Sequence, residues 1–245
     1  EVLIAGGADL NGKDAHCATP LYSAIWAEDA NMVELLVDKG ADVNFTGDEM
    51  WSPLLYGLCM DDMRMVRLLL DHGARFDLAG RDGWSALRYA VCTEDRDLME
   101  LFLAKGARVS KLHWAAWTGN LAEVRSLVEQ EAEIAGRDGE LGWTPLHWAA
   151  SGGREEVAAF MVDKGATVDA KDKHGNTPLV CAAAAGRRAV AQLLIAKGAD
   201  VNTKTPDGWT PLHAATSAGY AGLGLAFREN REVIEALIAK GADLD

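Results

Sequence analysis

The sequence has little of what marks membrane, secreted or nucleic-acid-binding proteins. No run of 18 apolar residues is present, so we expect no membrane-spanning helix. The 4 cysteines lack the spacing of a metal site or a disulfide framework, which indicates reduced thiols in a cytoplasmic protein and leaves the nucleus open. Lysine and arginine number 24 against 37 aspartates and glutamates, a net charge of -13 that argues against a nucleic-acid partner. The acidic balance favours solubility or a basic partner.

Signatures of catalysis are also missing. The sequence contains no phosphate-binding P-loop, no Gly-x-Ser-x-Gly elbow and no evident nucleophile–base pair. No two histidines or cysteines are spaced as metal ligands, and the carboxylates are scattered. We therefore expect a protein that is not an enzyme and that uses neither a cofactor nor a metal.

What recurs instead is a four-residue phrase, clearest as Thr144-Pro145-Leu146-His147. Its first position is filled again by Thr19, Ser52, Ser85, Ser110, Thr177 and Thr210. The successive offsets between these positions are 33, 33, 25, 34, 33 and 33 residues. A period near 33 predicts a repeat architecture in which each unit buries its apolar face against its neighbours.

Residues 144–169 show what one unit encodes. Thr144 suits a helix N-cap and Pro145 the first helical position, where a missing N–H costs nothing. A second helix is expected from about Arg154 to Asp163, after a Gly-Gly break. The Lys-Gly pair at 164–165 ends it, because glycine accepts the left-handed conformation there. Each unit is thus predicted to be a helix-turn-helix.

The chain resembles the ankyrin repeat family over nearly its whole length. Gly-Trp-Thr-Pro-Leu-His at 142–147 and 208–213, and Gly-Ala-Asp-Val-Asn at 40–44 and 198–202, carry this resemblance. It implies an all-α solenoid of about seven repeats with short β-turn fingers and a concave groove. It also implies a non-catalytic scaffold that binds a protein or an extended peptide, and neither nucleic acid nor membrane. The phrase histidines, His113, His147 and His213, would then bond between neighbouring units.

Two irregularities interrupt the period. Only four positions separate Gly106 from Ser110, where other repeats have 12, so one unit lacks its finger. Either this is a degenerate repeat in one continuous stack, or residues 106–111 form a bend between blocks 1–108 and 109–245. An insertion at 220–229 in the last repeat either packs on the solenoid or forms a partner-binding arm. Residues 1–9 align with 235–243, inside a second helix, so we expect a piece of a longer protein.

Tryptophans and acidic finger residues form the predicted binding face. The resemblance places these tryptophans at finger bases or at first-helix ends, facing the groove: Trp26, Trp51, Trp84, Trp117, Trp143 and Trp209. Acidic residues of the fingers would surround them: Asp48, Glu49, Asp82 and Asp207. An aromatic floor with an acidic rim suits a protein or peptide that carries Lys or Arg. The alternative is that the tryptophans only pack against the next finger.

Other interpretations remain open at this stage. Asn44 and Asn202 match the pattern that asparaginyl hydroxylases use in ankyrin repeats, although both residues can instead close a turn through their side chains. The chain could also be the recognition arm of a larger enzyme or bacterial effector, with the catalytic part outside it. A purely structural spacer is disfavoured by the grouped aromatics.

Overall fold

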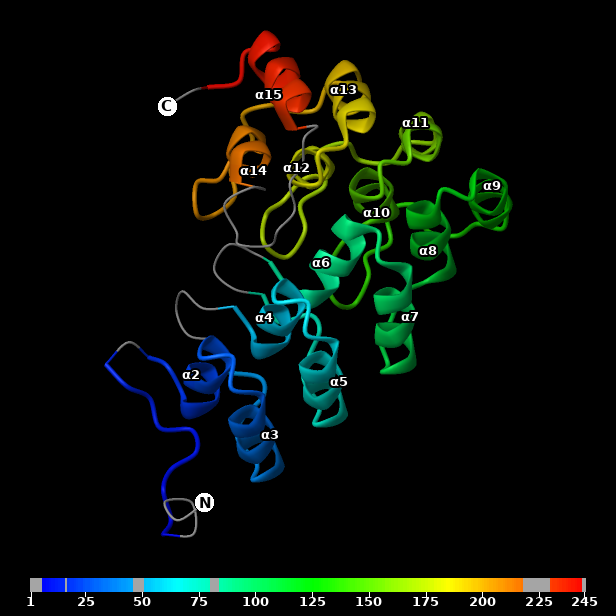
Figure 1. Cartoon of the computed structure of the whole chain (residues 1–245). Coiled ribbons are helices and arrows are strands. Elements are labelled where there is room, and N and C mark those ends of the chain that lie inside the picture. The colour runs from blue at the N-terminus through cyan, green and yellow to red at the C-terminus, as the bar shows by residue number, and fades with distance from the viewer. Residues whose placement is uncertain (1–5, 16, 46–50, 80–83, 218–229, 244–245) are drawn as a thin grey trace. The chain divides into compact units, whose positions relative to one another are not determined.

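The structure, a computed structural model, describes residues 6–15, 17–45, 51–79, 84–217 and 230–243 (Figure 1). Regular secondary structure in these residues is entirely α-helical. The helices are α2 (Pro20–Trp26), α3 (Ala30–Asp38), α4 (Pro53–Cys59), α5 (Met63–Asp71), α6 (Ala86–Thr93), α7 (Arg96–Ala104), α8 (Lys111–Thr118), α9 (Leu121–Glu129), α10 (Pro145–Ser151), α11 (Glu155–Asp163), α12 (Pro178–Ala184), α13 (Arg188–Ala196), α14 (Pro211–Ser217) and α15 (Asn230–Ala239). The predicted all-α repeat solenoid is confirmed.

The helices follow one another as seven pairs, each with a short first helix and a longer second helix. The chain divides into two compact units, Glu1–Tyr89 and Ala90–Asp245, with the division inside α6. In the first unit α2 packs on α4 and α3 on α5. In the second unit the first helices α8, α10, α12 and α14 form one row and the second helices α9, α11, α13 and α15 another. Within each of these two groups, every pair therefore packs on its neighbour with both helices.

The phrase at the start of each repeat folds as its chemistry predicts. The hydroxyl of Thr19 accepts a hydrogen bond from the Tyr22 amide at 3.2 Å, and Ser52 does the same for Leu55 at 3.3 Å. Proline occupies the first position of α2 and α4, where its missing donor leaves nothing unsatisfied. The buried leucine after each proline then anchors the first helix in the core.

Second helices end in a repeated Schellman turn. In α3 the Ala41 amide donates to the Leu36 carbonyl and the Gly40 amide to that of Val37, with Gly40 at φ 92°. The turn after α9 keeps this pattern without glycine. The Ala132 amide donates to Leu127, while Glu131 takes the left-handed conformation at φ 63°. The replacement of the Lys-Gly stop thus retains the turn but strains one residue.

The missing finger is visible in the helix boundaries. α7 ends at Ala104 and α8 begins at Lys111, whereas the stretch from the end of α9 to the start of α10 runs from Gln130 to Thr144. The bend at 106–111 and the blocks 1–108 and 109–245 stay predictions. The insertion at 220–229 lies outside the described residues. Within the described part of the chain, no helix has the length and apolarity needed to cross a membrane.

Candidate functional site

Four aromatic side chains gather in the first unit, from α2, from α4 and from the residues just before α4. We call this group the aromatic patch: Tyr22, Trp26, Trp51 and Tyr56. Tyr56 is its centre, with ring centroids 5.3 Å from Tyr22, 6.0 Å from Trp26 and 5.5 Å from Trp51. Two of the predicted tryptophans are therefore brought together by a residue that the sequence interpretation did not single out.

The two tyrosines hold the patch in a fixed arrangement. Their hydroxyl oxygens lie 2.6 Å apart in a hydrogen bond, and the rings meet edge to face. Burial, together with this bond, raises the pKa of Tyr22 far above its ordinary value. Tyr22 occupies the place of histidine in the repeat phrase, a departure that was readable in the sequence. A rigid aromatic base thus lies beneath Trp26.

Trp26 is the most exposed part of the patch. Its side chain is 68% exposed, the highest value among the large apolar residues of the described chain, while Trp51 and Tyr56 are half-buried. The loops that follow α2 and α4 place Glu28 and Asp61 on the surface, each in the left-handed conformation at φ 55°. An exposed indole with carboxylates on adjoining loops can accept a cationic side chain.

The other predicted tryptophans lie elsewhere. Trp84, Trp117 and Trp143 are 6%, 2% and 1% exposed. Arg88 covers the ring of Trp84 at 4.8 Å, and the Trp117 indole donates to the Val91 carbonyl at 3.0 Å. These three indoles offer no exposed surface to a partner, contrary to expectation, because the chain itself covers them.

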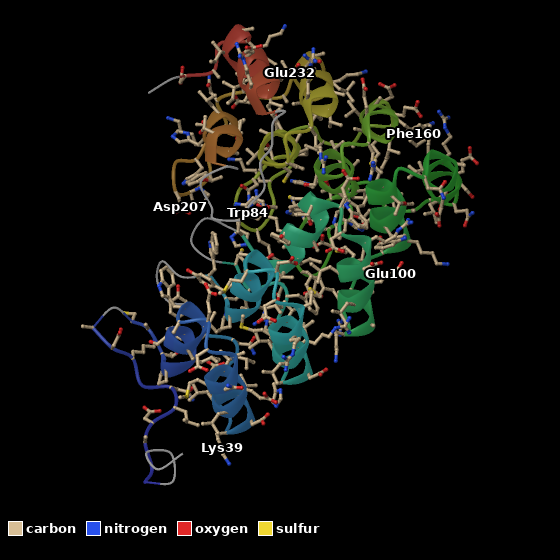
Figure 2. All side chains as sticks on the ribbon, in the orientation of Figure 1. Lys39, Trp84, Glu100, Phe160, Asp207 and Glu232 are labelled. Atoms are coloured by element: carbon tan, nitrogen blue, oxygen red, sulfur yellow. The ribbon has the colours of Figure 1, made fainter. Side chains whose placement is uncertain are left out.

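The structure describes Trp209 and only one of the four acidic finger residues that were predicted to surround the tryptophans. Trp209 is half-buried, 6.1 Å from the ring of His213. Asp207 is exposed in the finger before α14 (Figure 2). Three further acidic residues, Asp48, Glu49 and Asp82, lie outside the described residues. The structure therefore does not unite all predicted members into one surface.

Buried tryptophan–aspartate pairs stiffen the second unit. The Trp143 indole donates to Asp172 at 2.9 Å, and the Trp148 indole donates to Asp138 at 2.7 Å. Asp138 also accepts the backbone amides of Leu141 and of the next residue, which closes the finger turn. Asp138 thus joins its finger to α10, and Asp172 joins its finger to the residue at the base of the preceding finger, both through charge-assisted bonds.

Two of the three phrase histidines, His113 and His147, bond to the following repeat, whereas His213 is exposed and its Nδ1 lies 2.8 Å from the Thr210 hydroxyl of its own repeat. His147 Nε2 lies 3.1 Å from the Asn176 carbonyl, and His113 Nε2 lies 3.0 Å from the Trp143 carbonyl, in each case a residue of the following repeat. Burial lowers the pKa of His147 to about 4 and also lowers that of His113. Both rings are already committed to neighbouring backbone groups. Among the described residues, no group of three or more His, Cys, Asp or Glu could hold a metal ion.

Both candidate hydroxylation sites are held between repeats. The Asn44 side chain donates to the Gly73 carbonyl at 3.1 Å and accepts the Arg75 amide at 2.7 Å. Asn202 makes the equivalent pair, to Gly241 at 3.0 Å and from Asp243 at 2.8 Å. These side chains therefore join two neighbouring repeats rather than close a turn within one repeat. Hydroxylation of Asn44 or Asn202 stays a prediction.

Family models match most of the chain. The model for three copies of the ankyrin repeat matches residues 112–205 and 171–245, and the single-repeat model matches residues 16–48. The single-repeat match lies in the first compact unit, and the three-copy matches lie in the second.

Curated relatives match over shorter segments. Human protein phosphatase 1 regulatory subunit 27 is 43% identical over 68 residues, which are 28% of this chain and 44% of the relative. The palmitoyltransferase AKR1 of Lachancea kluyveri is 37% identical over 67 residues, 27% of this chain and 9% of the relative. Mouse ankyrin repeat and SAM domain-containing protein 6 is 38% identical over 61 residues, which are 25% of this chain and 7% of the relative. The chain spans less than half the length of each.

Proposed function

The chain belongs to the ankyrin repeat family, and from this premise we propose that it is a non-catalytic scaffold that binds a basic protein segment or extended peptide on the aromatic patch. Ankyrin repeats bind proteins, and one relative is by name a regulatory subunit of a phosphatase. The exposed indole of Trp26 is the single observation on which the choice of surface depends.

The physical case for this surface begins with the cost of exposure. An indole that is 68% exposed leaves apolar area in water, which burial under a partner would recover at about 25 cal/mol per Å². Tyr22 and Tyr56 already fix each other through their 2.6 Å hydrogen bond, so little side-chain entropy is lost when a partner settles on them. Tryptophan and tyrosine are also the residues most enriched among binding hot spots.

Charge supplies the preference for a basic partner. Glu28 and Asp61 are exposed on the loops next to the patch, and the chain as a whole has a net charge of -13. A Lys or Arg over the Trp26 face would gain a cation–π contact. The same contact exists inside the first unit, where the Lys13 ammonium lies 4.6 Å from the centre of the Phe45 ring.

The test is peptide selection followed by a single substitution. Random peptides displayed on phage are selected on the chain, and the binding of synthetic copies is measured by fluorescence anisotropy. We expect Lys- or Arg-containing peptides, and at least a tenfold loss of affinity, about 1.4 kcal/mol, for Trp26→Ala. Met32→Ala is the matched control, because Met32 is an exposed apolar residue on α3 of the same unit. Equal affinity of the Trp26→Ala protein for every selected peptide would sink the proposal.

A second candidate function is the recognition arm of a larger enzyme. The match to a palmitoyltransferase, of which the similar segment is 9%, favours it. Peptide binding by the patch is compatible with both functions. Mass-spectrometric identification of the full-length protein in its own cell distinguishes them by the presence or absence of a catalytic domain.

A further inference from the structure

The second unit has a cavity lined by four arginines. Its volume is about 660 Å³, and it lies where the loops between first and second helices approach the start of α15. Its charged lining residues are Arg154, Arg187, Arg188, Arg231, Glu94 and Glu232 (Figure 2 labels the last). Four cations against two anions give the cavity a formal charge of +2, in a chain whose net charge is -13.

Two of the arginines are held in fixed positions by the backbone. The Arg154 Nε donates to the Trp117 carbonyl at 2.8 Å, and the Arg187 Nε donates to the Ser151 carbonyl at 2.8 Å. Each carbonyl lies near the C-terminal end of the first helix of the preceding repeat, where the helix dipole favours a cation. The guanidinium groups are therefore pre-organised, and a ligand would lose little entropy in ordering them.

Glycines make room for these two side chains. A Cβ at Gly119 would lie 2.9 Å from Arg154 Cδ, and a Cβ at Gly153 would lie 3.0 Å from Arg187 Cδ. Both glycines have positive φ, at 78° and 69°. In the corresponding slots of earlier repeats the chain has Glu28, Asp61 and Glu94, all at positive φ. Along the chain, this position of the interhelical loop thus changes from an acidic residue to glycine, and at Gly153 and in the next repeat an arginine follows the glycine.

Glu94 shows how the cavity holds an anion. Its two carboxylate oxygens are shared between Arg154 Nη2 and Arg187 Nη2, the latter at 2.7 Å. Among the described residues, every hydrogen bond made by these two side chains runs through Nε or Nη2. A guanidinium has five N–H groups in a planar fork, so the Nη1 groups are the donors of these two side chains that no described residue accepts.

The mouth of the cavity adds charge at the surface. The Arg188 side chain is 51% exposed and that of Arg231 is 86% exposed, and their bonds go to Glu232 and Glu235 at 2.7 and 2.9 Å. Such exposed pairs contribute little stability, so both arginines can exchange partners at small cost. The cavity also borders the N-terminal turns of α13 and α15, where the helix dipole is positive.

We infer that this cavity, which we call the arginine cavity, is a second binding site, and that it takes an acidic peptide segment whose carboxylate or phosphoryl oxygens displace or join Glu94. The inference is independent of the aromatic patch, which lies in the other unit. A volume of about 660 Å³ is larger than one small ion needs and suits several side chains. The overall charge of -13 repels extended polyanions such as nucleic acid or an anionic membrane, whereas a short peptide carries few charges into the cavity.

The experiment uses the whole chain and a short fluorescein-labelled peptide that contains glutamates and one phosphoserine. Anisotropy is measured for this peptide, for its unphosphorylated form, and for a form with Gln in place of every Glu and Ser in place of phosphoserine. We expect one or both acidic forms to bind and the neutral form to bind at least tenfold more weakly. Comparison of the two acidic forms identifies which anion the arginines prefer. Failure of both acidic forms to bind more tightly than the neutral form overturns the inference.

Three variants locate the binding. The double substitution Arg188→Gln and Arg231→Gln should weaken binding about tenfold or more, whereas Arg108→Gln, an exposed arginine before α8, should leave it unchanged. Glu94→Gln should instead strengthen binding severalfold, because the internal competitor loses its charge. Thermal melts of each protein show that it is folded. Equal binding by the double variant, weaker binding by a folded Glu94→Gln protein, or tighter binding of a single-stranded oligonucleotide of the same charge would overturn the inference.

Discussion

The free energy of unfolding should decrease as the pH is lowered below neutrality, because of one buried histidine. His147 is 0% exposed, and its Nδ1 accepts the Thr144 amide at 3.1 Å. That bond requires an unprotonated Nδ1, so the proton of the neutral ring is on Nε2, which donates to the Asn176 carbonyl. A second proton on Nδ1 would oppose the Thr144 N–H and charge a ring that water cannot reach.

The magnitude follows from the difference between the folded and unfolded titrations. Burial is the largest cause that lowers the His147 pKa from 6.5 to about 4, and the nearby Asp172 only partly offsets it. Below pH 6.5 the unfolded chain binds more protons than the folded chain, so the free energy of unfolding decreases as the pH falls, until both states are protonated below about pH 4. Between pH 7 and pH 5 the loss assigned to His147 is about 2 kcal/mol.

Urea unfolding followed by tryptophan fluorescence measures this loss. The chain has 8 tryptophans, and one of them, Trp143, lies 6.0 Å from the His147 ring, so the signal includes this region. The difference in unfolding free energy between pH 7 and pH 5 should be about 2 kcal/mol smaller in His147→Gln than in the parent protein. His72→Gln, which removes an exposed histidine of the first unit, is the matched control. An identical pH dependence in the parent and in His147→Gln would refute the reasoning.

Two further substitutions test the strained turn and the buried pairs. Glu131→Gly should stabilise the protein by about 0.5–1 kcal/mol in the same urea assay, because glycine takes the left-handed conformation without strain but loses more entropy on folding. A decrease in stability would show that the Glu131 side chain makes a compensating contact. Trp148→Phe should cost about 1.5–3 kcal/mol, since it removes the indole donor to the buried Asp138 carboxylate. Trp26→Phe, at an exposed indole, controls for the change of ring, and equal costs at both positions would contradict the assigned bond.

The period of the sequence was enough to predict the fold. Thr19 and Ser52 cap helices as their hydroxyls predict, and Gly40 adopts the positive φ that the Lys-Gly stop implies. These features are local, involving groups a few residues apart, so spacing along the chain determines them. The structural role of His147 could also be anticipated, because the resemblance to ankyrin repeats implies that the phrase histidine bonds to the neighbouring repeat.

The exposed surface could not be predicted in the same way. Trp51 and Trp143 occupy the same slot of the repeat, yet Trp51 joins the patch while Trp143 is buried on Asp172. The burial of Trp143 depends on the next finger, which supplies Asp172 at 2.9 Å from its indole nitrogen. That is a property of the neighbouring repeat rather than of the tryptophan. The exposure of a side chain in a solenoid therefore depends on the neighbouring repeat. Its position within its own repeat is not enough to predict that exposure.

The arginine cavity was missed for the same reason. Arg154 and Arg187 each follow a glycine in the loop between two helices, and taken singly each looks like an ordinary surface cation. Only the stacking of repeats brings the two guanidinium groups onto Glu94, 60 residues before Arg154 in the chain. The loops of the first unit carry Glu28 and Asp61 in the slot that Gly119, Gly153 and Gly186 fill in later repeats of the second unit, and an arginine follows two of these glycines, at Arg154 and Arg187. The two proposed sites lie in different units, so we expect Trp26→Ala to leave binding of the acidic peptide unchanged, and the Arg188→Gln, Arg231→Gln double variant to leave binding of the basic peptide unchanged.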